Sequence, residues 1–157
     1  MSPPKPKPEG LVALRDRALG LLARREHSRF ELRRKLSDAA AEPGELDAVL
    51  DDLAAAGLQS DRRYAESFVR SRIERGQGPL RIRKELRQRG VEAALAEQAL
   101  AEAGVDWDAR LRDVHRKRFG STPPADRREQ ARQARFLAQR GFPDAAIRDL
   151  LTDPGEA

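Results

Sequence analysis

The chain has 157 residues and a formal net charge of +5, with 36% charged and only 4% aromatic side chains. It contains no cysteine, so it can form neither disulfides nor thiolate metal sites. Its apolar runs are far shorter than the roughly 20 residues that cross a bilayer. Alanine, leucine, arginine and glutamate dominate and favour helix. We therefore expect an all-α, cytoplasmic protein that contacts no membrane and holds no cofactor.

Residues 1–9 include the run SPPKPKPE, which has neither a helical period nor an apolar stretch, and they are predicted to form a disordered tail. The charge then alternates in blocks. Residues 10–37, 62–90 and 110–140 sum to +5, +7 and +7, whereas residues 38–61, 91–109 and 141–157 sum to −7, −5 and −3. Three basic blocks, each followed by an acidic one, indicate a repeat with a period of about 50 residues.

A shift of 50 residues superposes apolar positions and cations alike. Examples are Leu32 on Ile82, Leu36 on Leu86, Arg33 on Arg83, Arg34 on Lys84 and Leu50 on Leu100. A third, more diverged copy appears at a shift of 51 and places Lys84 on Arg135, Leu86 on Leu137 and Gly90 on Gly141. We predict three helical repeats, at residues 10–60, 61–106 and 107–157.

Each repeat is predicted to hold three short helices, because apolar residues recur at helical steps and the breaks carry capping residues. Ser28 and Glu31 match a capping box, and Pro79 suits a first helical position. Gly90 stands where a left-handed turn would end the second helix of the second unit, and the second helix of the third unit is predicted to end at Gly141. Units this small bury little surface alone, so we expect them to stack into an elongated, curved monomer.

The search for catalytic residues finds little. His27 and His115 have no second histidine at helical spacing, and phosphate-loop, dinucleotide and nucleophile-elbow motifs are absent. Asp47, Asp51 and Asp52 alternate with apolar residues as on the solvent side of an amphipathic helix. We expect no catalytic residue and no metal site.

Trp107 and Phe119 each stand alone among charged residues. We interpret them as anchors of the core or of a stacking interface, because base-stacking surfaces interleave several aromatic side chains with cations. His27 is expected to line the start of the second helix of the first unit.

The basic residues fall into two groups by their local partners. Arg81 and Arg89 lie four residues from Glu85, as Lys35 does from Glu31, and these cations are expected to be neutralised on their own helices. The second group lacks a well-placed carboxylate; its members are Arg33, Arg34, Arg83, Lys84 and Arg87. The last three lie outside the apolar stripe of Leu80, Ile82 and Leu86. Unneutralised cations at equivalent positions indicate an anionic partner, which is either phosphate or an acidic protein surface.

Three segments together resemble the RecX family, in the family's order and spacing. They are ALGLLARREHSRFELRRKL at 18–36, LQSDRRYAESFVRSRIERGQGPLRIRKELRQRGV at 58–91 and ARFLAQRGF at 134–142. One position departs from the family pattern, because Arg62 follows Asp61 where a glutamate is usual.

The resemblance implies three tandem three-helix repeats and no enzymatic activity. It also implies binding along the groove of the RecA recombinase filament, with restraint of its ATPase and strand exchange, in DNA repair, recombination and the SOS response. The residues themselves do not decide whether the protein inhibits or stimulates the filament, whether it lies in the groove or caps an end, or whether it contacts DNA. The resemblance also implies that the partner contacts the basic face of the first two helices of each unit. The residues placed on this face are Arg24, Arg25, Arg33, Arg34, Arg72, Arg75, Arg83, Lys84, Arg87 and Arg135.

The alternative is a helical repeat protein that binds DNA or RNA directly through the same basic faces. The acidic blocks count against it, because they would repel a continuous track of phosphates. An enzyme would be a third class, but no set of residues in the sequence supports it.

Overall fold

The computed structural model describes residues 8–40 and 42–152. Within these ranges the chain forms α-helices and one 3₁₀ turn, without strands, which confirms the predicted all-α class. The helices are α1 (Pro8–Arg24), α2 (Arg29–Leu36), α3 (Glu45–Ala55), α4 (Asp61–Glu74), α5 (Pro79–Gln88), α6 (Ala93–Glu102), α7 (Trp107–Phe119), α8 (Arg127–Arg140) and α9 (Asp144–Thr152), and the 3₁₀ turn is Ser37–Ala39. Helix α1 includes the last two residues of the predicted tail, and residues 1–7 lie outside the described part.

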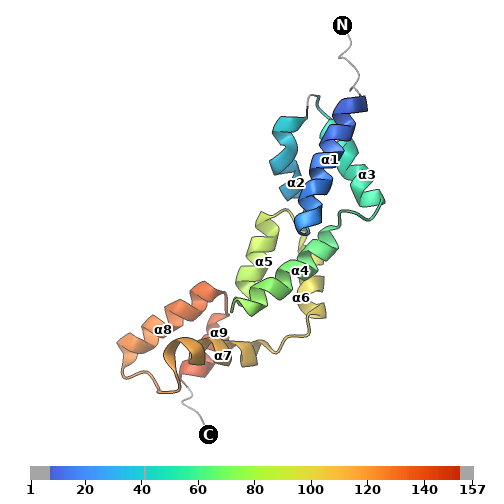
Figure 1. The fold of residues 1–157 in the computed structure, drawn as a ribbon. Coiled ribbons are helices and arrows are strands. Elements are labelled where there is room, and N and C mark those ends of the chain that lie inside the picture. Colours follow the sequence, from blue (N-terminus) through green and yellow to red (C-terminus); the bar gives the residue numbers. More distant parts are fainter. Residues whose placement is uncertain (1–7, 41, 153–157) are drawn as a thin grey trace.

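The helices form three units, α1–α3, α4–α6 and α7–α9, each around its own apolar core (Figure 1). The central side chains are Leu32, Leu36 and Leu50 in the first unit, Tyr64, Ile82 and Leu86 in the second, and Leu111, Leu137 and Phe142 in the third. The units follow one another in an elongated, bent row, with α1 and α9 in opposite end units, in agreement with the predicted architecture.

Side-chain caps define where several helices begin. The capping box predicted for α2 is present, since Ser28 accepts from the backbone N–H of Glu31 and the Glu31 carboxylate accepts from that of Ser28. The side chains of Asp106 and Asp126 cap α7 and α8, and each accepts a hydrogen bond from the backbone N–H three residues further on. Such a cap typically stabilises a helix by about 1 kcal/mol, so helices of only eight to seventeen residues have defined ends.

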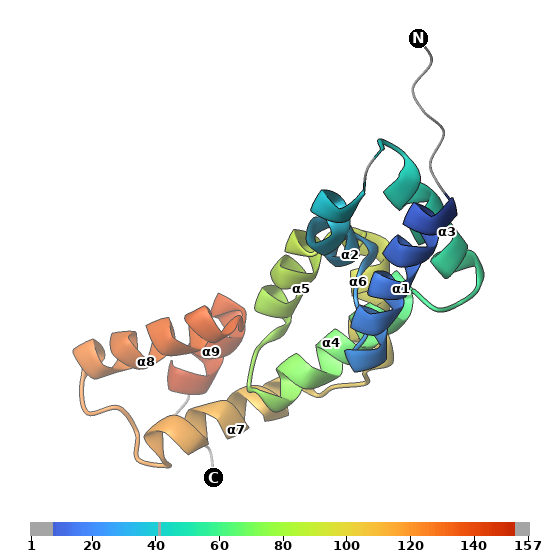
Figure 2. The same cartoon turned by 45° about the horizontal axis from the view of Figure 1, so that its top comes forward.

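The second helices, α2, α5 and α8, meet head to tail along one edge of the molecule (Figure 2). At the junction of the first two units, the Ser28 hydroxyl donates to the Arg89 carbonyl at 2.8 Å. At the next junction, the Gly78 backbone N–H donates to the Arg140 carbonyl at 2.7 Å. The two donors occupy equivalent positions in their repeats, as do the two acceptors. The same type of junction therefore joins the first unit to the second and the second to the third. We refer to α2, α5 and α8 as the second-helix row.

Glycine is required at both junctions. Gly90 and Gly141 have backbone φ angles of 77° and 101°, which most other residues adopt only with strain. A β-carbon on Gly90 would lie 2.4 Å from the Cβ of Phe30, and one on Gly141 would lie 2.3 Å from the Cβ of Arg81. The left-handed turn predicted at Gly90 is therefore confirmed, Gly141 adopts one as well, and both glycines let the next unit approach closely.

The junction between the first two units also holds a buried polar network. Asp61, the first residue of α4, accepts from the backbone N–H of Arg29 at 2.8 Å and from the Gln59 amide at 2.9 Å. His27 is 1% exposed, with Nδ1 3.0 Å from the Arg25 carbonyl oxygen and its own carbonyl accepting from Gln59. His27 thus lines the start of α2, as predicted.

Trp107 packs against the cores of both the second and third units, which confirms its predicted role as an anchor. Nearby, the Arg110 guanidinium donates to the Ile73 carbonyl at 2.7 Å. Phe119 has a more local role and meets Phe136 edge to face at 5.3 Å, which joins α7 to α8 within the third unit. The units are therefore linked by core contacts as well as by the row.

Candidate partner-binding surface

One cation per unit stands at the same position of the second-helix row. Arg34, Lys84 and Arg135 superpose under the repeat shifts, and all three are exposed. Within residues 8–40 and 42–152, none of their side chains has an ion pair, a side-chain hydrogen bond or a ring contact in this fold. These three positive charges are therefore available to a partner.

The helical period explains why these cations face outward. On α2, Arg34 lies two residues from each of the buried Leu32 and Leu36, and Lys84 lies between Ile82 and Leu86 in the same way. At about 100° per residue, a step of two positions places a side chain on the far side of the helix from its buried neighbours. The cores that hold the units together thus orient the cations toward solvent.

The prediction that Arg33 and Arg83 lack a carboxylate partner is wrong. Arg33 forms an ion pair with Asp47 on α3, and Arg83 forms one with Glu97 on α6, including a 3.2 Å hydrogen bond from Nη2 to Oε2. Each pair spans 14 residues and joins the second helix of a unit to its third, so a search along one helix could not find it. The two pairs are equivalent, and both cations serve the fold.

The acidic residues of α3 have a similar role. Asp47 and Asp51 are exposed, as expected for the solvent side of an amphipathic helix. They also hold α2 in place, because the Arg29 guanidinium lies 3.7 Å from Asp47 and 2.7 Å from Asp51. The acidic blocks between the basic ones are thus in part the internal counterions of the second helices.

Arg25 is also engaged within the protein. Its guanidinium donates to both carboxylate oxygens of Glu31 at 3.1 Å. Burial alone would raise the pKa of Glu31, but the hydrogen bonds from Arg25 and from the Ser28 backbone outweigh it and lower that pKa. The predicted pairing of Glu31 with Lys35 is wrong, because the Lys35 ammonium lies 3.0 Å from His27 Nε2 instead.

Arg72 likewise faces inward. Its guanidinium stacks on the Phe68 ring at 4.5 Å and lies 3.5 Å from the Glu85 carboxylate, and burial lowers its pKa. With a side chain only 17% exposed, Arg72 joins α4 to α5. The other predicted contact residues, Arg24, Arg75 and Arg87, are exposed, and no ion pair joins them to another described residue.

Two apolar residues of this surface escaped the sequence-based prediction. Leu80 was expected in the buried stripe with Ile82 and Leu86, but it is 46% exposed, and Phe30 is 40% exposed at the equivalent position of α2. Leu80 lies two residues before Ile82, so the helical period already turns it away from the core. A shallow hollow on α5 is lined by Leu80, Arg83, Lys84, Arg87 and Gln88.

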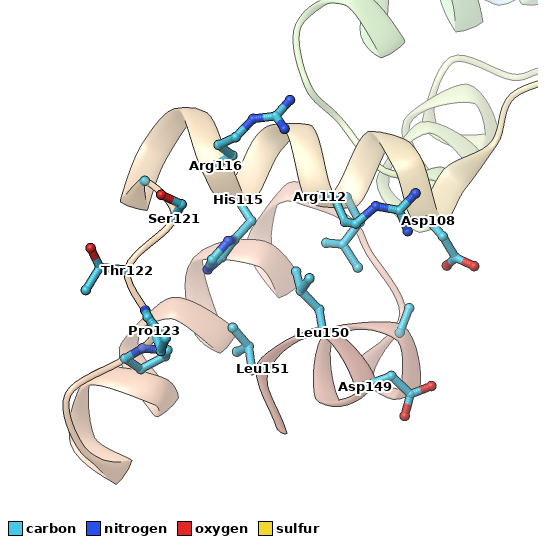
Figure 3. Close-up of a pocket in the computed structure, with 14 residues that line it drawn as sticks. Asp108, Arg112, His115, Arg116, Ser121, Thr122, Pro123, Asp149, Leu150 and Leu151 are labelled. Atoms are coloured by element: carbon cyan, nitrogen blue, oxygen red, sulfur yellow. The ribbon is translucent and has the colours of Figure 1, made fainter. Parts of the chain in front are cut away.

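A separate hollow of about 760 Å³ lies in the third unit, between α7, α9 and the loop that follows α7 (Figure 3). His115 points into it and has Nε2 2.8 Å from the Gln133 side-chain oxygen, whereas Arg116 and Asp149 point away from Leu150 and Leu151. The ionisable groups therefore do not converge as an acid–base site requires. In the described part of the chain, no group of three or more His, Cys, Asp or Glu residues could hold a metal ion.

The fold and this surface define a helical repeat protein of three tandem units whose outward cations recur along one row. Family models for RecX match every unit: the first three-helix domain at residues 15–53, the second at 60–100 and the third at 106–151. The chain belongs to the RecX family.

Relatives agree with this assignment, and a solved structure has the same fold. The regulatory protein RecX of Halorhodospira halophila is 54% identical over 136 residues, which cover 87% of this chain and 84% of the relative. The regulatory protein RecX of Pseudomonas savastanoi pv. phaseolicola is 51% identical over 144 residues, 92% of this chain and 93% of the relative. The crystal structure of RecX from Lactobacillus salivarius superposes with a TM-score of 0.77 at 22% identity, covering 93% of this chain and 97% of that one.

The family is one of regulators and not of enzymes, as predicted from the sequence. Among the described residues, no helix is both long and apolar enough to span a membrane.

Proposed function

We propose that this protein binds the RecA–DNA filament along its helical groove and inhibits the ATPase and strand-exchange activities of RecA in recombination and repair. The observation that carries the proposal is the row of equivalent unpaired cations, Arg34, Lys84 and Arg135. A regular array of binding groups suits a partner that is itself a polymer of identical subunits. Membership of the RecX family supports RecA as that polymer.

Multivalency explains how such weak contacts would suffice. An exposed ion pair typically contributes about 0.2–1 kcal/mol, which is too little for specific binding. Three contacts on one connected row bind together, because each contact made raises the effective concentration of the others. The junctions at Gly90 and Gly141 fix the spacing between the cations and hence the register with the partner.

Inhibition would follow from occupancy. A regulator that binds one conformation of a filament more tightly than the others shifts the population toward that conformation. A chain that lies across several RecA subunits would favour the arrangement matching its row and resist the changes that accompany ATP turnover. No catalytic group is needed for this effect.

The test compares two triple variants with the same change in charge. The first, Arg34→Glu, Lys84→Glu and Arg135→Glu, reverses the row. The control, Arg17→Glu, Arg70→Glu and Arg148→Glu, reverses exposed cations on α1, α4 and α9 that have no ion pair with another described residue. The first variant should bind RecA filaments about 100-fold more weakly, since three contacts of up to about 1 kcal/mol are lost and repulsion is added. The control should stay close to wild type.

Binding is measured by co-sedimentation with RecA-coated single-stranded DNA and with bare DNA at two salt concentrations, and circular dichroism checks that both variants remain helical. Equal weakening of both variants would show that net charge alone matters. Equal wild-type affinity for bare and coated DNA, with one common salt slope near −0.7 per phosphate contact, would favour direct nucleic-acid binding instead. RecA ATPase should fall with wild type and recover with the row variant.

A further inference from the structure

Four large apolar side chains are exposed in the described part of the chain, and two of them are equivalent. Val12 and Leu58 occupy unrelated positions, whereas Phe30 and Leu80 lie 50 residues apart, in the first turn of α2 and of α5. Exposed apolar residues scattered singly are normal on protein surfaces. Recurrence at one position of two repeats, on the same row as the unpaired cations, is the unusual feature.

Each of these apolar residues shares a helix face with unpaired cations. Arg34 follows Phe30 by four residues, and Lys84 and Arg87 follow Leu80 by four and seven. Residues at these steps lie side by side along one face of a helix. The hollow on α5 confirms the arrangement, because Leu80, Lys84 and Arg87 all line it.

The fold does not require the outer part of these side chains to be apolar. The position of Leu80 is fixed through its backbone, whose N–H donates to the Gly141 carbonyl at 3.0 Å. Neither Phe30 nor Leu80 belongs to the core of its unit. Their exposed surface would gain by burial against a partner.

We propose that the stripes Phe30–Arg34 and Leu80–Lys84–Arg87 are two equivalent docking points for a protein partner. Each would take one acidic segment of a filament subunit, with its apolar side chain seated in a hollow and its cations on the surrounding carboxylates. This rests on the proposed function and names the part of the filament that the row contacts, which is protein and not DNA.

The chemistry of the stripes favours protein over nucleic acid. Phosphates would satisfy Arg34 and Lys84, but they offer nothing to bury Leu80. The Phe30 ring could stack on a base, whereas the aliphatic side chain at the equivalent position, Leu80, could not. An acidic protein surface with an apolar recess complements both parts of the stripe. The third unit carries Ala131, Arg135 and Ala138 at the corresponding positions, so it would contribute a cation without an apolar anchor.

The test uses the full chain with Leu80→Ser, and with Leu58→Ser as the matched control, since Leu58 is 43% exposed and lies off the row. Leu80→Ser should weaken binding to RecA-coated DNA about tenfold, as expected for losing the burial of about half a leucine side chain, with an unchanged salt slope. Leu58→Ser should bind as wild type. Leu80→Met keeps an apolar side chain and should restore most of the affinity.

The outcomes separate this inference from the proposed function. If wild type binds the filament and Lys84→Glu weakens that binding while Leu80→Ser does not, the row binds through charge alone and the docking points are rejected. If Leu80→Ser loses as much affinity for bare DNA as for RecA-coated DNA, the stripe contacts nucleic acid and the proposal is overturned. If sedimentation shows that the wild type is a dimer and that Leu80→Ser is a monomer, the stripe contacts a second copy of this chain. That outcome would also overturn the proposal. Failure of wild type to prefer coated DNA would overturn the proposed function and the docking points together.

Discussion

Individual side chains decide whether a cation of this protein stabilises the fold or remains available to a partner. Arg33 and Arg34 are neighbours on α2, yet Arg33 is paired with Asp47 while Arg34 has no carboxylate partner among the described residues. The same division separates Arg83 from Lys84 on α5. A step of one residue turns a side chain by about 100°, which is enough to move it from the third helix of the unit to the solvent.

The pair formed by Arg83 and Glu97 gives a test at this scale. Arg83→Glu places two carboxylates together between α5 and α6 and should lower the free energy of unfolding by up to about 1 kcal/mol. The double variant Arg83→Glu and Glu97→Arg restores opposite charges and should recover most of this loss in urea unfolding. Lys84→Glu has no counterion to lose and serves as the control. Equal destabilisation by Lys84→Glu and Arg83→Glu would contradict the assignment.

His27 makes the stability of the first junction depend on pH. Burial is the main cause that lowers its pKa, and the nearby Arg25 and Lys35 add to the effect. The Arg25 carbonyl and the Glu31 carboxylate act in the opposite direction without reversing it. Because the folded protein holds this proton less tightly than the unfolded chain, whose histidine pKa is about 6.5, stability is complete above that pH. It is lost as the pH falls toward the lowered pKa of the folded state.

We therefore expect the free energy of unfolding to decrease between pH 7.5 and pH 5.5. His27→Gln should remove much of this decrease, although the variant itself is less stable, because glutamine does not titrate. His115→Gln, which replaces the other histidine of the sequence, is measured in parallel. An unchanged pH dependence in His27→Gln would assign the effect to other groups.

At the scale of elements, the repeat period predicts the second helices well and their ion pairs poorly. The capping box at Ser28 and the turns at Gly90 and Gly141 are local features, so a few neighbouring residues suffice to predict them. The contact between Arg83 and Glu97 depends on how α5 crosses α6, which no single helix reveals. A signal was nevertheless available, because Asp47 and Glu97 superpose under the same shift as Arg33 and Arg83.

The junctions between units are harder to predict, for a physical reason. Most of their hydrogen bonds have a backbone group on at least one side, such as the Arg89 and Arg140 carbonyls, which every sequence possesses. The side chains that take part, such as Ser28 and Asp61, also match helix-start positions, and the central glycines match left-handed turns, so each is explained without any neighbouring unit. For this reason the all-α class and the elongated shape were predictable, whereas the head-to-tail row was not.

Gly141→Ala tests the junction between the second and third units. An alanine there must adopt a φ near 101° and place its β-carbon within van der Waals overlap of Arg81, so we expect a loss of more than about 2 kcal/mol. Gly104→Ala is the control, because Gly104 has a φ of 62° but a β-carbon there would meet no atom within 4 Å, and it should cost only about 1 kcal/mol. Small-angle scattering of Gly141→Ala should also show a changed arrangement of the third unit. If both variants lose the same free energy of unfolding, the overlap of the new β-carbon with Arg81 is relieved without cost and the prediction is wrong.

For the molecule as a whole, the arrangement of the units matters as much as the charges they carry. Each unit has its own core, and Trp107 extends the core of the second unit into the third. The row therefore holds its cations at defined intervals on a connected scaffold, and this is the property that binding to a polymer would require. A set of independent helices with the same charges would lose the benefit of binding together.

The geometry of the junctions also restricts how a second copy of this chain could join its ends. In the first unit the position equivalent to Gly90 is Ala40, whose backbone is extended, with φ −81° and ψ 128°. In the third unit the position equivalent to the N-cap residues Ser28 and Gly78 is Glu129, which is the third residue of α8, whose own N-cap is Asp126. A second copy could not repeat the junction at either end, so we expect that the chain cannot polymerise through it. The end units would then act as terminators, and a protein proposed to bind a filament would be kept from forming one of its own.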